Sequence, residues 1–181
     1  MQGPGIGDQG PAPARRVMGI DPGLSETGWA VVESRPTEKL LASGVIRTAA
    51  GTPLPERLRS IHEELSGLIG THRPASVAVE DMFFTGAAAT IRGTLEARGV
   101  ILLAASSAAL PISEYHPRTV KLALTGSGGA AKLQVRRMVE RLLRLDKPPK
   151  PNDLSDAIAI ALCHLRFSRR KTREAGESPE Q

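Results

Sequence analysis

The sequence predicts an α/β domain with one five-stranded mixed sheet flanked by helices. Three strand-like apolar runs follow one another near the N-terminus, which indicates an antiparallel meander. After them, segments with helical periodicity alternate with two more short strands, which is typical of helices packed on a sheet. The 181 residues, 40% hydrophobic and 24% charged, suit one globular domain with a substantial core.

The first half of the chain contains four of the expected strands and one helix. The four strands are expected at residues 16–21, 27–34, 40–48 and 76–80. The Pro22-Gly23 pair forms the first turn, and Pro36 lies in the second gap. A helix is expected over residues 54–70, because its leucine and isoleucine residues recur at helical spacing before Pro74.

The second half is mostly helical. The expected elements are an alanine-rich helix at 87–105, a strand at 111–115, and helices at 117–124, 132–145 and 152–168. A glycine-rich break at 126–129 and a stiff proline-rich linker at 148–151 separate the last three helices. Asn152 or Asp153 supplies an N-cap for the final helix.

Both ends of the chain differ in composition from the middle. Residues 1–15 are rich in Gly, Pro, Ala and Gln, and residues 169–181 are polar, so we expect a disordered extension and tail around a domain at 16–168. No secretory signal is visible, and the longest apolar stretch is too short to span a bilayer, which favours a cytoplasmic protein without a membrane partner. The single cysteine, Cys163, lies in an apolar run and is expected to be a core residue.

Positive charge is concentrated in one region. Residues 118–150 contain nine basic and two acidic side chains, whereas the whole chain has a net charge of +5. A solvated helix face is the ordinary explanation of such a run. The large excess of basic over acidic side chains in this segment favours a polyanionic partner instead.

Four acids occupy unusual positions. Asp21 and Glu80 each end an apolar strand, and Asp153 and Asp156 share one face at the start of an apolar helix. Taken singly, Asp21 suits a turn, Asp153 an N-cap and Asp156 a helix first turn, while Glu80 suits a solvated strand end. Taken together, they predict a cluster in which Asp21 lies within metal-bridging reach of Glu80 and Asp156.

Clustered carboxylates need a compensating positive charge. A pair of divalent cations about 3.5–4 Å apart provides it and supports phosphodiester hydrolysis. Carboxylate oxygens suit Mg²⁺ or Mn²⁺, and no Cys or His cluster has the spacing of a zinc site. We therefore expect two Mg²⁺ or Mn²⁺ ions in each active site.

Several segments together resemble the RuvC family, the bacterial Holliday junction resolvases. The segment 19–29 is similar to its first-strand signature, 79–84 to its second acidic strand, and 152–161 to its last catalytic helix. Segments 115–121 and 126–135 match in the same order, so the resemblance covers about residues 16–168. The extension at 1–15 lies outside the family pattern.

The resemblance implies a ribonuclease H-like fold and a homodimer that resolves four-way DNA junctions by paired symmetric nicks. The implied metal ligands and catalytic acids are Asp21, Glu80, Asp153 and Asp156, with Lys132 as a further catalytic residue. The expected DNA-binding residues, from the resemblance and the basic run, are Phe83, Arg118, Lys121, Lys132 and Arg136. Phe83 is equally well explained as a packed core residue, and the lysines as solvated ones. The implied partners are the RuvA junction-binding protein and the RuvB branch-migration motor.

The expected mechanism is two-metal-ion hydrolysis that leaves 5′-phosphate and 3′-hydroxyl ends. A phosphate-binding ATPase of the actin and sugar-kinase type also uses an Asp-x-Gly turn, but it needs a second such turn and a second domain. A non-catalytic junction-binding protein is disfavoured, because four acids hinder DNA binding by their charge. The remaining alternative is another ribonuclease H-like nuclease, for instance one that processes ribosomal RNA.

Overall fold

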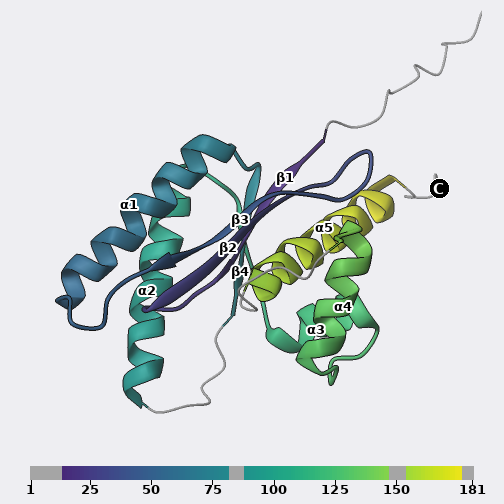
Figure 1. Ribbon diagram of the computed structural model, residues 1–181. Coiled ribbons are helices and arrows are strands. Elements are labelled where there is room, and N and C mark those ends of the chain that lie inside the picture. The colour runs from purple at the N-terminus through teal and green to yellow at the C-terminus, as the bar shows by residue number, and fades with distance from the viewer. Residues whose placement is uncertain (1–13, 82–87, 147–153, 177–181) are drawn as a thin grey trace, which may run out of the picture.

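In the computed structural model, a five-stranded sheet lies between two layers of helices (Figure 1). The structure describes residues 14–81, 88–146 and 154–176. The strands are β1 (Arg16–Asp21), β2 (Glu26–Glu33), β3 (Lys39–Arg47), β4 (Ser76–Glu80) and β5 (Ile112–Tyr115). The helices are α1 (Leu54–His72), α2 (Ala88–Ser107), α3 (Pro117–Thr125), α4 (Lys132–Leu143) and α5 (Leu154–Gly176). The predicted elements are thus confirmed in type and order.

The sheet is mixed, as predicted, with the order β3-β2-β1-β4-β5. The first three strands form the antiparallel meander, whereas β4 runs parallel to β1 and β5 parallel to β4. Because Ile20 of β1 is in register with Val79 of β4, Asp21 and Glu80 end neighbouring strands at the same edge of the sheet.

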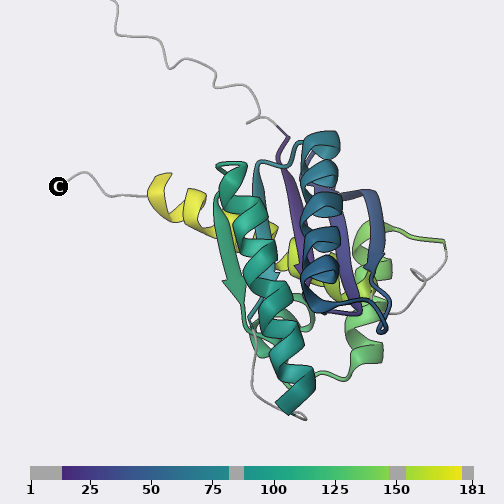
Figure 2. The same ribbon diagram turned by 90° about the vertical axis from the view of Figure 1, so that its left-hand side faces the viewer.

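The alternation of side chains along a strand decides which layer each acid faces. Met18 and Val79 belong to the core beneath α1 and α2, whereas Val17 and Ala78 belong to the core beneath α5. Asp21 lies four residues after Val17 and Glu80 two residues after Ala78, so both acids point to the same side as these residues and face the α5 layer. Figure 2 shows α1 and α2 side by side on the opposite face of the sheet.

Gly19 allows α5 to approach β1 closely. A Cβ atom at residue 19 would lie 2.2 Å from the carbonyl oxygen of Ala157 and 2.7 Å from the backbone nitrogen of Ala161. The obstacles are backbone atoms, which cannot rotate away as a flexible side chain can. Any side chain at this position would therefore push the start of α5, which carries Asp156, away from the sheet.

The structure differs from the sequence prediction mainly at helix ends. The final helix extends to Gly176, so the tail expected to be disordered from residue 169 is helical over most of its length. Arginine, lysine, glutamate and alanine in this stretch are good helix formers, and no proline interrupts them. Helix α4 ends earlier than expected, at Leu143, because Arg144 adopts a left-handed conformation (φ 51°).

Some predicted features lie outside the described residues. They are the extension up to residue 13, Phe83, the proline-rich linker and Asp153. Within the described part of the chain, no helix is both long enough and apolar enough to cross a membrane.

Candidate active site

The carboxyl groups of Asp21 and Glu80 meet at the shared edge of β1 and β4 and form a hydrogen bond. Burial is the main reason that the pKa of Asp21 rises to about 8, and the charges of Glu80 and Asp156 raise it further. Burial likewise raises the pKa of Glu80, while the hydrogen bond from Asp21 opposes that rise. The pair therefore keeps one proton at pH values well above the usual carboxyl pKa range. Asp21 is the residue that carries this proton.

Asp156 approaches the same edge from the first turn of α5. Its charge raises the pKa of both Asp21 and Glu80, which shows that the three acids share one electrostatic environment. Its Oδ2 atom accepts a hydrogen bond from Nζ of Lys132, at 3.1 Å. Of the four acids predicted to cluster, the described structure places these three at one edge of the sheet, from β1, β4 and α5.

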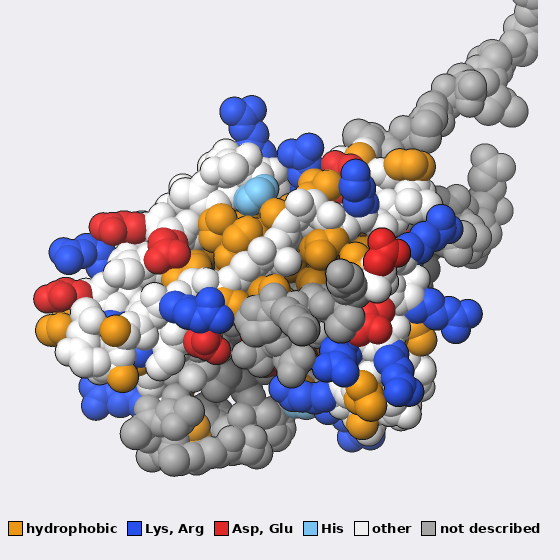
Figure 3. Space-filling view, in the orientation of Figure 1, with side chains coloured by type: hydrophobic (Ala, Val, Ile, Leu, Met, Phe, Trp, Pro, Cys, Tyr) orange, Lys and Arg blue, Asp and Glu red, His pale blue; other side chains and the backbone are white. Residues whose placement is uncertain are grey.

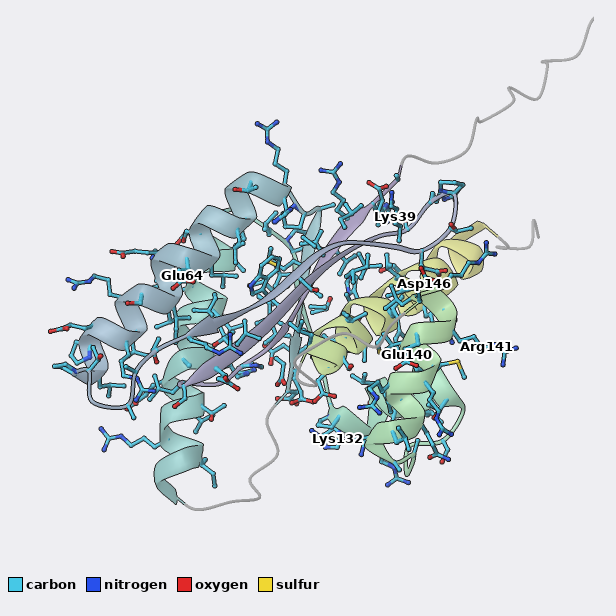
Figure 4. The ribbon with its side chains drawn as sticks, viewed as in Figure 1. Lys39, Glu64, Lys132, Glu140, Arg141 and Asp146 are labelled. Atoms are coloured by element: carbon cyan, nitrogen blue, oxygen red, sulfur yellow. The ribbon has the colours of Figure 1, made fainter. Side chains whose placement is uncertain are left out.

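Two of the predicted basic residues also reach this site. Lys132, the first residue of α4, lowers the pKa of both Asp21 and Glu80, and Lys121 of α3 lowers that of Glu80. Figure 4 shows Lys132 at one end of α4, whereas Arg141 lies toward the other end and points outward. The positive charges of both lysines thus act on the acids, and Lys132 also forms an ion pair with one of them, Asp156.

The two predicted arginines are placed differently. Arg118 is exposed at the start of α3, and its side chain packs against Gly128, where an added Cβ atom would lie 2.6 Å from Arg118 Cγ. Arg136 is half-buried and forms an ion pair with Glu140 of its own helix, with 3.7 Å between Nε and Oε1. Figure 3 shows basic side chains gathered over the layer of α3 and α4. Arg118 and Arg136 lie on these two helices, and neither affects the pKa of Asp21 or Glu80 as the two lysines do.

The chemistry of the acids suits a hard divalent cation. Carboxylate oxygens are the ligands that Mg²⁺ and Mn²⁺ prefer. The raised pKa values of Asp21 and Glu80 show that the nearby lysines offset burial and mutual repulsion only in part. Among the described residues, however, no three potential ligands stand close enough together to form a ready-made metal site. Asp21 and Glu80 are in contact, but the predicted metal-bridging set with Asp156 is not preformed.

Cys163 takes no part in this chemistry. It is buried in α5, and burial raises the pKa of its thiol to about 12, so the thiol stays protonated near neutral pH. Its prediction as a core residue is confirmed.

Sequence reasoning missed two arginines on the opposite side of the site. Arg57 is buried in the first turns of α1, where its spacing from Ile61 and Leu65 already places it on the apolar face. Arg98 of α2 forms ion pairs with Asp81, which follows Glu80, and with Glu114 of β5. Arg57 could have been noticed in the sequence, because it is a charged residue on the apolar face of a predicted helix.

Comparison with known proteins agrees with this arrangement. Residues 17–164 match the family model described as crossover junction endodeoxyribonuclease RuvC. The chain belongs to the RuvC family. The crossover junction endodeoxyribonuclease RuvC of Salinispora arenicola is 47% identical over 152 residues, covering 83% of this chain and 87% of that protein. The protein of the same name from Endomicrobium trichonymphae is 44% identical over 151 residues, covering 82% and 80%.

Solved structures of the RuvC family share the fold. The structure of Thermus thermophilus RuvC in complex with a Holliday junction substrate has a TM-score of 0.83 at 38% identity, covering 87% of this chain and 97% of that one. The yeast mitochondrial Holliday junction resolvase Ydc2, at 12% identity and a TM-score of 0.65, supports the fold alone. The predicted ribonuclease H-like fold is therefore confirmed.

Proposed function

We propose that this chain is an endonuclease that resolves Holliday junctions in DNA recombination and repair. The observation that supports the proposal is the contact of Asp21 with Glu80 and of Lys132 with Asp156 at one edge of a RuvC-type fold. A binding module has no need to bury mutually repelling acids beside a surface that attracts DNA. The basic layer of α3 and α4 next to this edge suits a phosphate backbone.

The catalytic residues in this proposal are Asp21, Glu80, Asp156, Asp153 and Lys132. The four acids would hold two Mg²⁺ or Mn²⁺ ions, which when bound supply an activated water and stabilise charge on the phosphate. Deprotonation of the Asp21–Glu80 pair has to precede binding, because a protonated carboxyl is a poor ligand. Lys132 forms an ion pair with Asp156, and in this proposal its ammonium group would turn toward a substrate phosphate.

DNA binding is assigned to Arg118, Lys121, Lys132, Arg136 and Phe83. Lys121, whose charge lowers the pKa of Glu80, would contact phosphate near the cut, whereas Arg118 and Arg136 would hold the backbone further away. The products would carry 5′-phosphate and 3′-hydroxyl ends.

Paired symmetric nicks require two active sites, and a two-fold dimer provides them. Helix α2 presents a stripe suited to self-association: Leu95 is 38% exposed, Leu103 is 58% exposed, and nothing lies within 4 Å of a Cβ atom added at Gly99 between them. These residues recur every four positions, so they share one face of the helix. A glycine between leucines lets a second helix approach closely.

A single acidic substitution on α2 tests whether this helix forms the dimer interface. Leu103→Glu is expected to convert the dimer into a monomer in size-exclusion chromatography with light scattering, because the carboxylate would be buried at the interface. Leu41→Glu on β3 is the matched control, since Leu41 is an exposed leucine on another element, and it should stay dimeric. A dimeric Leu103→Glu protein would exclude α2 as the interface.

RuvA and RuvB are proposed as partners that load the enzyme and move the junction, and the cytoplasm as the place of action. Both follow from membership of the RuvC family.

The function is tested by nicking of a synthetic four-way junction against linear duplex of the same sequence. With Mg²⁺ or Mn²⁺ we expect symmetric nicks in the junction alone, and with EDTA no nicks in either DNA. Equal cutting of both DNAs would contradict junction specificity and favour a general nuclease. Binding of the junction without cutting under every metal condition would favour a non-catalytic module.

A further inference from the structure

Arg57 is the one charged side chain among the buried residues that the structure describes, with 8% of its surface exposed. Arg57 makes no ion pair within the described part of the chain. A buried cation without a carboxylate partner lowers the stability of the folded state. Instead, its guanidinium donates from Nε to Thr48 Oγ1 at 2.8 Å and from Nη2 to Ser25 Oγ at 2.9 Å. The buried charge of Arg57 is therefore hydrogen-bonded to two hydroxyl groups, one of which belongs to a residue shortly after Asp21 in the sequence.

The two hydroxyl groups hold the turn that follows Asp21. Thr48 donates its hydroxyl hydrogen to the carbonyl of Leu24 at 2.5 Å, and its backbone N–H donates to the carbonyl of Ser25 at 3.1 Å. A threonine hydroxyl has one hydrogen, and a guanidinium can only donate. Arg57 therefore obliges Thr48 Oγ1 to accept from it, which directs the single hydroxyl hydrogen to Leu24.

The rest of this turn is held equally closely. The Thr27 hydroxyl donates to the carbonyl of Gly23 at 2.7 Å. The side chain of Leu24 packs on α2, where a Cβ atom added at Gly93 would lie 2.9 Å from Leu24 Cδ2. The residues just after Asp21 are thus held by Thr48, which follows β3, and by α1 and α2. Arg57 of α1 hydrogen-bonds both Thr48 and Ser25.

We propose that Arg57 is a positioning residue for Asp21. By orienting Thr48 and Ser25 it fixes the turn at residues 22–25, and that turn fixes the carboxylate at the end of β1. Arginine suits this role because its planar fork spans two acceptors, whereas a lysine ammonium offers a single point. The inference rests on the proposed function, in which Asp21 binds metal.

The test uses substitutions that spare the buried charge. Thr48→Val keeps the shape of the side chain but removes the hydroxyl, and Thr48→Ser keeps the hydroxyl. For Thr48→Val we expect kcat on the four-way junction to fall roughly 10- to 100-fold with KM within about twofold, because a displacement of ~1 Å can cost about 100-fold in rate. Thr48→Ser should stay within about twofold of the parent rate. Arg57→Lys should give an intermediate rate.

Two readouts separate positioning from simple loss of folding. Mn²⁺ binding without DNA, followed by electron paramagnetic resonance, should weaken in Thr48→Val and not in Thr48→Ser. Amide hydrogen exchange should speed up in the peptide covering residues 21–28, while the β4 and α5 peptides keep their protection. Both effects arise from a loosened turn and not from global unfolding.

The inference fails if Thr48→Val nicks the junction and binds Mn²⁺ like the parent. It also fails if exchange rises uniformly over the chain, since Arg57 would then support only general stability. If the unsubstituted protein itself leaves the junction intact, the proposed function fails instead. The Mn²⁺ and exchange measurements still decide whether Arg57 orders the turn.

Discussion

Asp21→Asn is expected to abolish nicking of four-way junctions while leaving junction binding intact. The asparagine amide preserves the size of the side chain and the turn after β1 but removes a charged metal ligand. Loss of ~4 kcal/mol of transition-state stabilisation corresponds to a roughly thousandfold lower rate. The rate is measured with a labelled junction under single-turnover conditions, and binding by gel shift without divalent metal.

Asp146→Asn is the matched control for this substitution. Asp146 is an exposed acid just beyond α4, on the part of the structure remote from Lys132 (Figure 4). Its replacement removes the same charge from the chain and should leave nicking unchanged. Nicking by Asp21→Asn at the parent rate would exclude Asp21 from metal binding.

The same Asp21→Asn substitution is expected to stabilise the metal-free protein at alkaline pH. In the folded state the pKa of Asp21 is about 8, against an ordinary value of 3.8, chiefly because of burial. Between these two values the folded state holds a proton that the unfolded state has released, so the free energy of unfolding falls as pH rises. Each unit of pKa shift corresponds to about 1.4 kcal/mol, part of which the variant recovers.

Thermal unfolding in EDTA from pH 5 to pH 9 measures this effect. The parent Tm should fall toward pH 8 more steeply than that of Asp21→Asn, by several degrees, since about 1 kcal/mol shifts Tm by roughly 2–4 °C at this size. Adding Mn²⁺ at pH 8 should raise the parent Tm and leave the variant nearly unchanged. Parallel pH profiles for the two proteins would show that Asp21 is not the group with the raised pKa.

Local patterns in the sequence were enough to predict most of the elements. Apolar runs bounded by Pro22, Pro36 and Pro74 predicted strands and a helix with ends within a few residues of those observed. Periodicity works here because it reflects burial of one face of each element, which neighbouring residues alone determine. The end of α5 was missed, because polar composition argued for disorder while the same residues favour helix.

The acids were predicted to lie within metal-bridging reach of one another, and the described structure shows this contact for Asp21 and Glu80 but no ready-made set of three with Asp156. That Asp21 and Glu80 are neighbours depends on the parallel pairing of β1 with β4, and these strands are separated by a meander and a helix. Pairing between distant strands is set by the packing of the whole sheet, so no local pattern reveals it. The sequence indicated that both acids end apolar strands, and the family resemblance added their expected role as metal ligands.

Asp21 was conspicuous in the sequence as an acid that ends an apolar strand before Pro-Gly. Three contacts are visible only in the tertiary structure. They are the hydrogen bond of Asp21 with Glu80, the bond between Lys132 and Asp156, and the bond of Arg57 with Thr48 beside the following turn. The same holds for the contact of α5 with Gly19, where the absence of a side chain sets the depth at which Asp156 lies. Residue types and their spacing follow from the chain, whereas burial and hydrogen-bond partners arise only when distant segments pack.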